Sequence, residues 1–315
     1  MPPFIINNLR DDFRQAINCF LHYCLLMAKS PDFFIIGGMK CATSTLHEQL
    51  ALQPGIFMTE LKEPNYFSND EIFAQGKDWY LSHFQAAEST DICGESSTHY
   101  TKLPTYPHTV DRLLTAYPTA KFIYVMRHPI DRLVSQFIHE WSQLVIKDKD
   151  INQAIINFPE LVDYSRYTYQ LTPYFERLPR SQILPVFFEQ MLKQPQLELE
   201  RVASFLGYPQ TPKWSSDLDA QNISSQRLRK NALRDFLVDL PGLKQIRRNF
   251  IPKTFRTKVR NLWTFKEKPQ LSESSLSYLQ QQFDPDLAML GSWLGIELNC
   301  QNFKQQVTSQ RLEWQ

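Results

Sequence analysis

A short glycine-containing turn carries the residues of this chain best suited to bind a phosphate group. Gly37 and Gly38 follow an apolar run, and Lys40 stands two residues later, before three hydroxyl side chains. Backbone N–H groups at a helix start point at a bound anion, a lysine adds a full positive charge, and hydroxyl groups complete the shell. The stretch therefore predicts an anion cradle between a strand and a helix. Its expected members are Gly38, Met39, Lys40, Cys41, Ala42, Thr43, Ser44 and Thr45.

The order of residues in this turn differs from the common nucleoside triphosphatase loop. That loop reads Gly-x-x-x-x-Gly-Lys-Ser/Thr, with the lysine directly before the hydroxyl residue. Here Cys41 and Ala42 separate Lys40 from Thr43. The predicted strand 121–126 is followed by Arg127 rather than by the acidic side chain that holds Mg²⁺ in such enzymes. We therefore expect no metal site. The alternative for Lys40 taken alone is an ordinary surface lysine.

A second candidate anion site follows another apolar run. Arg127 comes directly after the predicted strand 121–126, and Ser135 lies eight residues on, inside the next predicted helix. Ligands of parallel sheets bind at the carboxyl ends of the strands, which is where both Lys40 and Arg127 fall. The alternative for Arg127 is a salt bridge to Asp131 or to Glu140.

The strand followed by Lys-x-x-Thr-Ser-Thr and the strand ending in Arg-x-Pro together resemble the two donor-binding loops of sulfotransferases. These enzymes use 3′-phosphoadenosine 5′-phosphosulfate as donor, and the resemblance spans roughly residues 31–298. It implies that the cradle at Lys40 binds the 5′-phosphosulfate, and that Arg127 and Ser135 bind the 3′-phosphate. This transfer needs no obligatory metal. The chain departs from the family pattern at Cys41 and Ala42, where a glycine is more usual and gives the backbone more freedom.

Glu63 is the candidate general base, and Lys40 is the candidate stabiliser of the leaving group. Segments 61–68, 76–80 and 94–97, in this order, resemble the carbohydrate-type and bacterial branches of the family, including heparan sulfate sulfotransferases. In those branches a glutamate in a Glu-x-x-aromatic-Phe segment takes the proton that an attacking hydroxyl or amine must lose. The leaving oxygen gains charge, which a lysine stabilises. The alternative for Glu63 is a turn carboxylate paired with Lys62.

Three other titratable side chains lie near these segments. His99 is the competing base, because cytosolic small-molecule sulfotransferases use a histidine for this step, although its context does not match that branch. Glu95 is interpreted either as a partner that orients a site residue or as a buried structural carboxylate. His47, in the helix after the cradle, is interpreted as a structural or surface histidine.

Apolar runs alternate with helical segments along the chain. Strands are predicted at 32–37, 92–95, 121–126 and 183–188, and helices at 43–52, 106–116, 129–141, 197–206 and 272–294. This alternation predicts an α/β, P-loop-like three-layer fold, with a central parallel sheet flanked by helices.

Composition narrows the classes of partner and the location. The chain has 315 residues and a net charge of +1, so nothing attracts it to nucleic acid as a whole. Its five cysteines lack metal-like spacing and a disulfide framework, which favours a reducing, cytoplasmic location. The apolar segment 17–28 is too short to span a bilayer and lacks a signal peptide's flanks, so an amphipathic helix is predicted there.

The expected organisation is a helical N-terminal arm over 1–30, one sulfotransferase domain over 31–300 and a C-terminal tail over 301–315. The domain would contain a basic helical insert at about 227–265. Within it, residues 244–260 hold seven basic side chains and no acidic one. These residues form either a solvated pair of helices or a basic surface that binds an anionic acceptor or a phospholipid membrane. The second alternative predicts peripheral membrane contact.

Three functions therefore stand side by side. The first is a sulfotransferase acting on a hydroxyl or amine, with a carbohydrate or glycolipid favoured as acceptor. The second is a P-loop nucleotide kinase, and the third is a non-catalytic nucleotide-binding or membrane-surface protein. Acceptor contacts are expected from loops at about 64–80, 98–108 and 140–165, whose aromatic side chains either stack on sugar rings or form core. Neither the acceptor nor the oligomeric state follows from the sequence.

Overall fold

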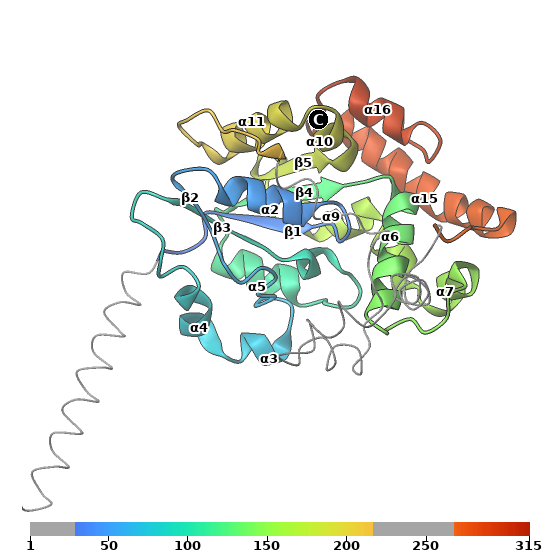
Figure 1. Cartoon of the computed structure of the whole chain (residues 1–315), viewed down its shortest axis with the longest axis horizontal. Helices are drawn as coiled ribbons and strands as arrows, with labels where there is room; N and C mark the ends of the chain where they lie inside the picture. Colours follow the sequence, from blue (N-terminus) through green and yellow to red (C-terminus); the bar gives the residue numbers. More distant parts are fainter. Residues whose placement is uncertain (1–28, 217–267) are drawn as a thin grey trace, which may run out of the picture.

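The computed structural model describes residues 29–216 and 268–315. A five-stranded parallel sheet lies at its centre (Figure 1), in the order β2-β3-β1-β4-β5. The strands are β1 (Phe33–Gly37), β2 (Ile56–Met58), β3 (Ile92–Ser96), β4 (Lys121–Met126) and β5 (Ile183–Phe187). The predicted α/β fold class is thereby confirmed.

Helices cover both faces of this sheet, which is why its strands are apolar on both sides (Figure 1). One face packs against α2 (Thr43–Ala51), α10 (Phe188–Lys193) and α11 (Pro195–Leu206). The other face packs against α4 (Gly76–Ser82), α5 (Thr109–Ala116), α6 (Pro129–Ser142), α9 (Tyr167–Phe175) and α15 (Glu273–Leu294). Along β1, Phe33 and Ile35 enter the first core, and Phe34 and Ile36 enter the second.

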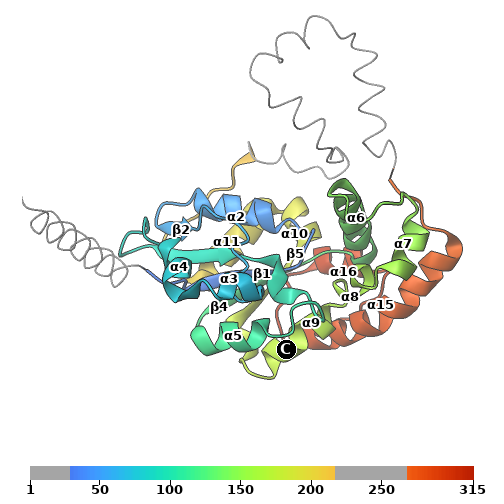
Figure 2. The same ribbon diagram turned by 90° about the horizontal axis from the view of Figure 1, so that it is seen from below.

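Shorter elements connect these layers. They are α3 (Asp70–Phe73), η1 (Thr98–Thr101), α7 (Ile151–Asn157), α8 (Glu160–Asp163), η2 (Arg180–Gln182) and α16 (Phe303–Ser309). Figure 2 shows α15 running past α7 and α9 along one side of the sheet. The segments expected to be acceptor loops thus contain α3 and α4, η1, and α7 and α8.

The four predicted strands and five predicted helices all occur, with ends shifted by three residues or fewer. Pro129 is the first residue of α6, and Gly207 ends α11 in a left-handed conformation. Pro185 is tolerated in β5 because this strand lies at the edge of the sheet.

The last residues contribute to the core rather than extending from it. Residues 301–315, predicted as a tail, contain α16, whose Phe303 and Val307 are buried with the second core. The indole N–H of Trp314 donates to the carbonyl of Ile183, 2.7 Å away, and so ties the C-terminus to β5.

Two predicted regions lie outside the described residues: most of the N-terminal arm, and the basic insert at 227–265 with its segment 244–260. Across 29–216 and 268–315, no helix combines the length and apolar character needed to cross a bilayer.

Candidate active site

The predicted cradle lies at the carboxyl end of β1. The Gly38 N–H donates to the carbonyl of Val125 at 2.7 Å, and the Cys41 N–H donates to the carbonyl of Gly38 at 3.2 Å. These two bonds fold the turn back against β4. Helix α2 then begins at Thr43, and no side chain caps its N-terminus. The first N–H groups of a helix have no partner inside it, so they are available to an anion here.

The departure from the family pattern has a visible backbone consequence. Both Lys40 and Ala42 have a φ of 68°, in the left-handed region that glycine adopts most easily. Ala42 holds this conformation at the N-cap of α2 despite its Cβ, at a cost of about 1–2 kcal/mol. The alanine therefore strains the cradle without preventing the turn.

The predicted cradle residues do not all offer groups to a ligand. Cys41 is fully buried in the core beside α2, and burial raises the pKa of its thiol to about 12. Because the N–H groups of Cys41 and Gly38 already bond within the protein, these two residues shape the turn. The start of α2 and the side chain of Lys40 are the parts suited to an anion.

Arg127 brings the second predicted anion site to the first. It follows β4 directly, and its Nη1 donates to the carbonyl of Lys40 at 3.2 Å. Its guanidinium stacks on the ring of Phe188, 4.5 Å from the ring centroid, while Nε is buried without a hydrogen-bond partner. A buried N–H donor without a partner is costly, so it marks a place for an acceptor atom. Ser135 is buried in the second turn of α6.

Arg132 supports the cradle from behind, a role that the sequence reasoning missed. This arginine of α6 is fully buried, and its Nη1 donates to the carbonyl of Met39 at 3.4 Å. Its other nitrogens donate to Ser165, Gln136 and the carbonyl of Leu161. An arginine in an amphipathic helix is usually predicted to lie on the solvated face. Only the apolar residues around Arg132 in the sequence could have indicated that it is buried.

The start of α10 supports Arg127 in a similar way. Glu189 accepts a hydrogen bond from the His128 N–H at 2.9 Å, and the His128 ring lies 2.8 Å from the carbonyl of Cys300. Burial raises the pKa of Glu189, although the His128 N–H and Arg127 oppose this effect. These contacts fix His128, the residue directly after Arg127.

Glu63 lies beyond the carboxyl end of β3, where the chain returns to the sheet edge. Its N–H donates to the carbonyl of Ser96 at 2.9 Å. The carboxylate accepts hydrogen bonds from the Thr98 N–H and from the Thr98 hydroxyl, each at 3.0 Å. Lys62 pairs with the other oxygen at 2.8 Å. The ion pair with Lys62, which the sequence offered as the alternative for Glu63, is therefore present. Thr98 of η1 also holds the Glu63 carboxylate in place.

Opposing effects act on the Glu63 carboxyl group. Burial alone raises its pKa, but the adjacent Lys62 and the hydrogen bonds from Thr98 outweigh burial and hold the pKa below its usual value. Glu63 is therefore ionised at neutral pH and ready to accept a proton. Its side chain keeps 29% of its surface exposed, which leaves it accessible to an acceptor.

His99, the competing base, belongs to η1 and stacks on the ring of Tyr106 at 4.5 Å. Burial, and then the charge of Lys102, lower its pKa to about 4, so the ring is neutral at pH 7. Lys102 is itself buried, 5.7 Å from the centroid of the Tyr164 ring. Burial lowers the pKa of Lys102 to about 8, although the nearby carboxylates of Glu63 and Glu140 act to raise it. Sequence reasoning overlooked this lysine.

The other two titratable candidates are structural. His47 is buried, its Nδ1 lies 2.9 Å from the hydroxyl of Ser96, and burial followed by Lys62 lowers its pKa to about 4. Glu95 is fully buried one residue before the end of β3, and neither of its oxygens makes a hydrogen bond of normal geometry. Burial raises its pKa to about 7, although the nearby hydroxyls of Tyr100 and Tyr80 pull it down.

Five of the aromatic residues proposed as acceptor contacts are core residues. They are Tyr66, Phe67, Tyr80, Tyr100 and Trp141, all buried. The sequence left open whether such rings stack on sugars or form core, and these five form core. Phe73 and Tyr106 keep more exposed surface.

Comparison with known proteins finds similarity to sulfotransferases. Residues 77–212, which contain Arg127 but not Lys40, match the model of the sulfotransferase family. The membrane-associated sulfotransferase kil1 of Dictyostelium discoideum is 34% identical over 110 residues, 34% of this chain and 22% of that protein. Heparan sulfate glucosamine 3-O-sulfotransferase 5 of Mus musculus is 26% identical over 227 residues, 69% of this chain and 61% of that protein.

A crystal structure supports the fold. The sulfotransferase of Alicyclobacillus acidocaldarius matches with a TM-score of 0.57 at 21% identity, over 86% of this chain and 98% of that one. The chain thus spans about a fifth and about three fifths of the two relatives named above. By its fold, by its two joined anion loops and by these matches, the chain is similar to sulfotransferases.

Proposed function

We propose that the protein transfers the sulfuryl group of 3′-phosphoadenosine 5′-phosphosulfate to a hydroxyl or amine of a carbohydrate or glycolipid acceptor. The observation that carries the proposal is the junction of the two anion loops, where Arg127 Nη1 bonds the carbonyl of Lys40. A donor with phosphate groups at both ends of one ribose needs two anion sites in fixed register.

The donor would be held by groups of different kinds. The uncapped start of α2 and the side chain of Lys40 suit the 5′-phosphosulfate. Arg127, with its buried Nε, suits the 3′-phosphate, and Ser135 adds a hydroxyl in the same helix that Arg127 precedes. Arg132 keeps the turn in place but does not itself reach toward solvent.

Glu63 would accept the acceptor's proton. As the acceptor oxygen or nitrogen bonds to sulfur, the bond from sulfur to the 5′-phosphate oxygen breaks and the bisphosphate leaves. The proton passes to the ionised Glu63 carboxylate, and Lys40 and the α2 N-terminus stabilise the negative charge on the leaving oxygen. The low pKa of Glu63 makes it a modest base, so its contribution depends on its fixed position on Thr98.

A carbohydrate acceptor rests on the relatives. Heparan sulfate glucosamine 3-O-sulfotransferase 5 is named for a glycan acceptor, and its similarity covers 69% of this chain. Lys62 and Lys102 add positive charge near Glu63, which favours an acceptor that carries a carboxylate or sulfate of its own.

The test is transfer of ³⁵S from the labelled donor to the unsulfated glycan heparosan and to a neutral glycolipid, without added metal. We expect label in an acceptor with the wild-type protein, and none above background with Lys40→Ala. Phosphoryl transfer from ATP that requires Mg²⁺, with no sulfuryl transfer to either acceptor, would support the kinase alternative instead.

A further inference from the structure

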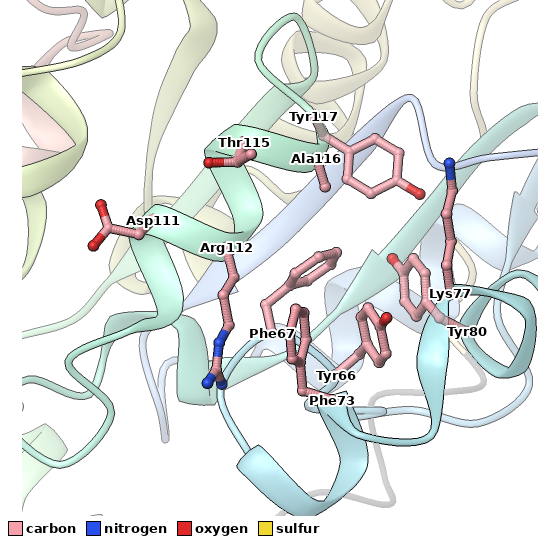
Figure 3. A pocket seen from close by; sticks show the side chains of 10 residues that line it. All are labelled: Tyr66, Phe67, Phe73, Lys77, Tyr80, Asp111, Arg112, Thr115, Ala116 and Tyr117. Atoms are coloured by element: carbon pink, nitrogen blue, oxygen red, sulfur yellow. The ribbon is translucent and has the colours of Figure 1, made fainter.

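A pocket of about 520 Å³ lies away from the cradle, between α3, α4 and α5 (Figure 3). Its volume falls in the range of small-molecule sites. Ten residues line it: Tyr66, Phe67, Phe73, Lys77, Tyr80, Asp111, Arg112, Thr115, Ala116 and Tyr117. Neither the sulfuryl donor nor the Glu63 carboxylate accounts for this pocket, because neither Glu63 nor any predicted donor-binding residue lines it.

The floor of the pocket is a rigid aromatic cluster. The Tyr66 and Tyr80 rings stack with centroids 4.7 Å apart and planes 13° apart, and Phe67 meets Tyr80 edge-on at 5.2 Å. Phe67 also packs edge-on against Phe34 of β1 at 6.2 Å, which anchors the cluster to the sheet. Tyr66, Phe67 and Tyr80 are themselves 5% exposed or less, so they hold the floor rigid, while Phe73, 36% exposed, offers apolar surface to a planar ligand without reorganisation.

In the part of the chain that the structure describes, some charged side chains around the pocket form ion pairs and one does not. At one side, Arg112 pairs with Asp70 at 2.7 Å and lies 4.4 Å from the centroid of the Phe73 ring. Asp111 pairs with Arg177. On the opposite side in Figure 3, Lys77 of α4 is exposed, and no acidic side chain of the described residues pairs with it.

The end of the pocket near Lys77 therefore has a positive charge and a spare donor. The Tyr117 hydroxyl, which Figure 3 shows turned toward this end, is buried without a hydrogen-bond partner. Asp78 follows Lys77 in α4 but does not line the pocket. An ammonium group with a hydroxyl donor, beside a flat apolar floor, matches a carboxylate or similar anion on an aromatic body.

We propose that this pocket is a binding site for a small organic anion with a flat body of one or two rings, whose anionic group faces Lys77. The body lies beside the exposed ring of Phe73, above the buried Tyr66 and Tyr80 cluster and between α4 and α5. Because Tyr66 follows Glu63 by three residues, the occupant contacts the same segment that carries the candidate base. Binding here requires neither Lys40 nor the sulfuryl donor.

The test is calorimetric titration with 2-naphthoate and its neutral counterpart 2-naphthylmethanol, at pH 6, below the pKa of about 7 of the nearby buried Glu95. We expect Lys77→Met to weaken 2-naphthoate at least threefold and to leave 2-naphthylmethanol unchanged. Ala116→Trp fills the pocket and should remove binding of both. Ala116 is exposed, so this variant should fold, and Thr115→Trp at the neighbouring exposed position provides a second filled pocket.

Two controls separate this site from the donor site. Lys213→Met removes an exposed lysine that does not line the pocket and should bind both probes as the wild type does. Lys40→Ala should also bind them normally, whatever it does to sulfuryl transfer. The proposal is overturned if folded wild-type protein binds neither probe, if both filled variants bind as tightly as the wild type, or if Lys40→Ala abolishes binding.

Discussion

Glu63 forms the structural ion pair with Lys62 and is also the proposed general base. The contact with Lys62, expected if Glu63 were only a paired turn carboxylate, is present at 2.8 Å, and it keeps the carboxylate ionised. The Thr98 bonds, which no sequence pattern reveals, fix its direction. Pairing keeps Glu63 ionised but also weakens it as a base, so its contribution depends on how it is positioned toward the acceptor.

Replacing Glu63 by glutamine tests this role. Glutamine keeps the size and can accept a hydrogen bond from Thr98, but it takes up no proton. We expect the turnover rate to fall by about 10²–10⁴-fold, the usual contribution of a positioned general base. Binding of 3′,5′-bisphosphoadenosine should stay within about twofold of the wild type. Full activity of Glu63→Gln, with loss of activity in His99→Ala, would move the base to His99.

Glu95 gives a stability prediction with a definite sign. Its pKa in the fold is about 7, above the ordinary 4.5, so the folded state holds its proton more tightly than the unfolded chain. The stability that this proton contributes is complete below pH 4.5 and is lost as the pH rises through 7. Glu95→Gln stays neutral at every pH. We expect the variant to gain about 3 kcal/mol relative to the wild type between pH 4.5 and 8.5.

Denaturant titrations of both proteins across this range measure the difference directly. A constant difference between wild type and Glu95→Gln at all pH values would mean that Glu95 titrates normally and is not buried as a neutral acid.

At the scale of elements, strands and helices with long apolar patterns were predictable, and short ones were not. β4 was placed to the residue, because five apolar or aromatic positions follow Lys121 and stop directly before Arg127. β2 has three residues, too few for any pattern, and it exists because it pairs with β3. The turn at Lys40 was predictable as a motif, but its bond to Arg127 depends on two strands meeting in space.

Gly37 is the position at which this turn tolerates least change. An added Cβ would lie 1.9 Å from the Thr101 hydroxyl, which is buried and bonded to the carbonyl of Ile36. Its φ of 153° is also unfavourable for other residues. We expect Gly37→Ala to destabilise the fold by about 2–4 kcal/mol and to weaken donor binding.

Gly55→Ala is the matched control for this change. Gly55 also has a positive φ, of 85°, but no atom lies within 4 Å of the added Cβ. The control should therefore show only the backbone cost, about 1 kcal/mol. Chemical denaturation measures both variants, and equal losses would mean that contact with Thr101 is not what requires glycine at position 37.

At the scale of the whole molecule, one core joins segments from both ends of the described chain. Phe34 of β1 and Phe303 of α16 belong to the same buried cluster, which also includes α15. The sequence analysis predicted a C-terminal tail over residues 301–315. Only the packed structure shows that three of its apolar side chains, Phe303, Val307 and Leu312, are buried.

Two substitutions measure the contribution of this C-terminal segment. Phe303→Ala empties a fully buried position, and we expect a loss of about 3–5 kcal/mol in the free energy of unfolding. Trp314→Phe removes the bond from the indole N–H to Ile183 and part of the ring that packs against Phe175 and Trp293, and should cost at least about 1 kcal/mol. Urea titrations test both values, and a Phe303→Ala protein as stable as the wild type would show that the segment is dispensable.

The donor site is the central claim, and its most direct measurement is calorimetric titration with 3′,5′-bisphosphoadenosine in the absence of metal. Wild-type protein and Lys40→Ala are compared, each first shown to be folded. We expect metal-free binding by the wild type and a loss of at least tenfold in affinity for Lys40→Ala. A folded wild-type protein that does not bind the bisphosphate, or a Lys40→Ala variant that binds it equally well, would contradict the proposed donor site.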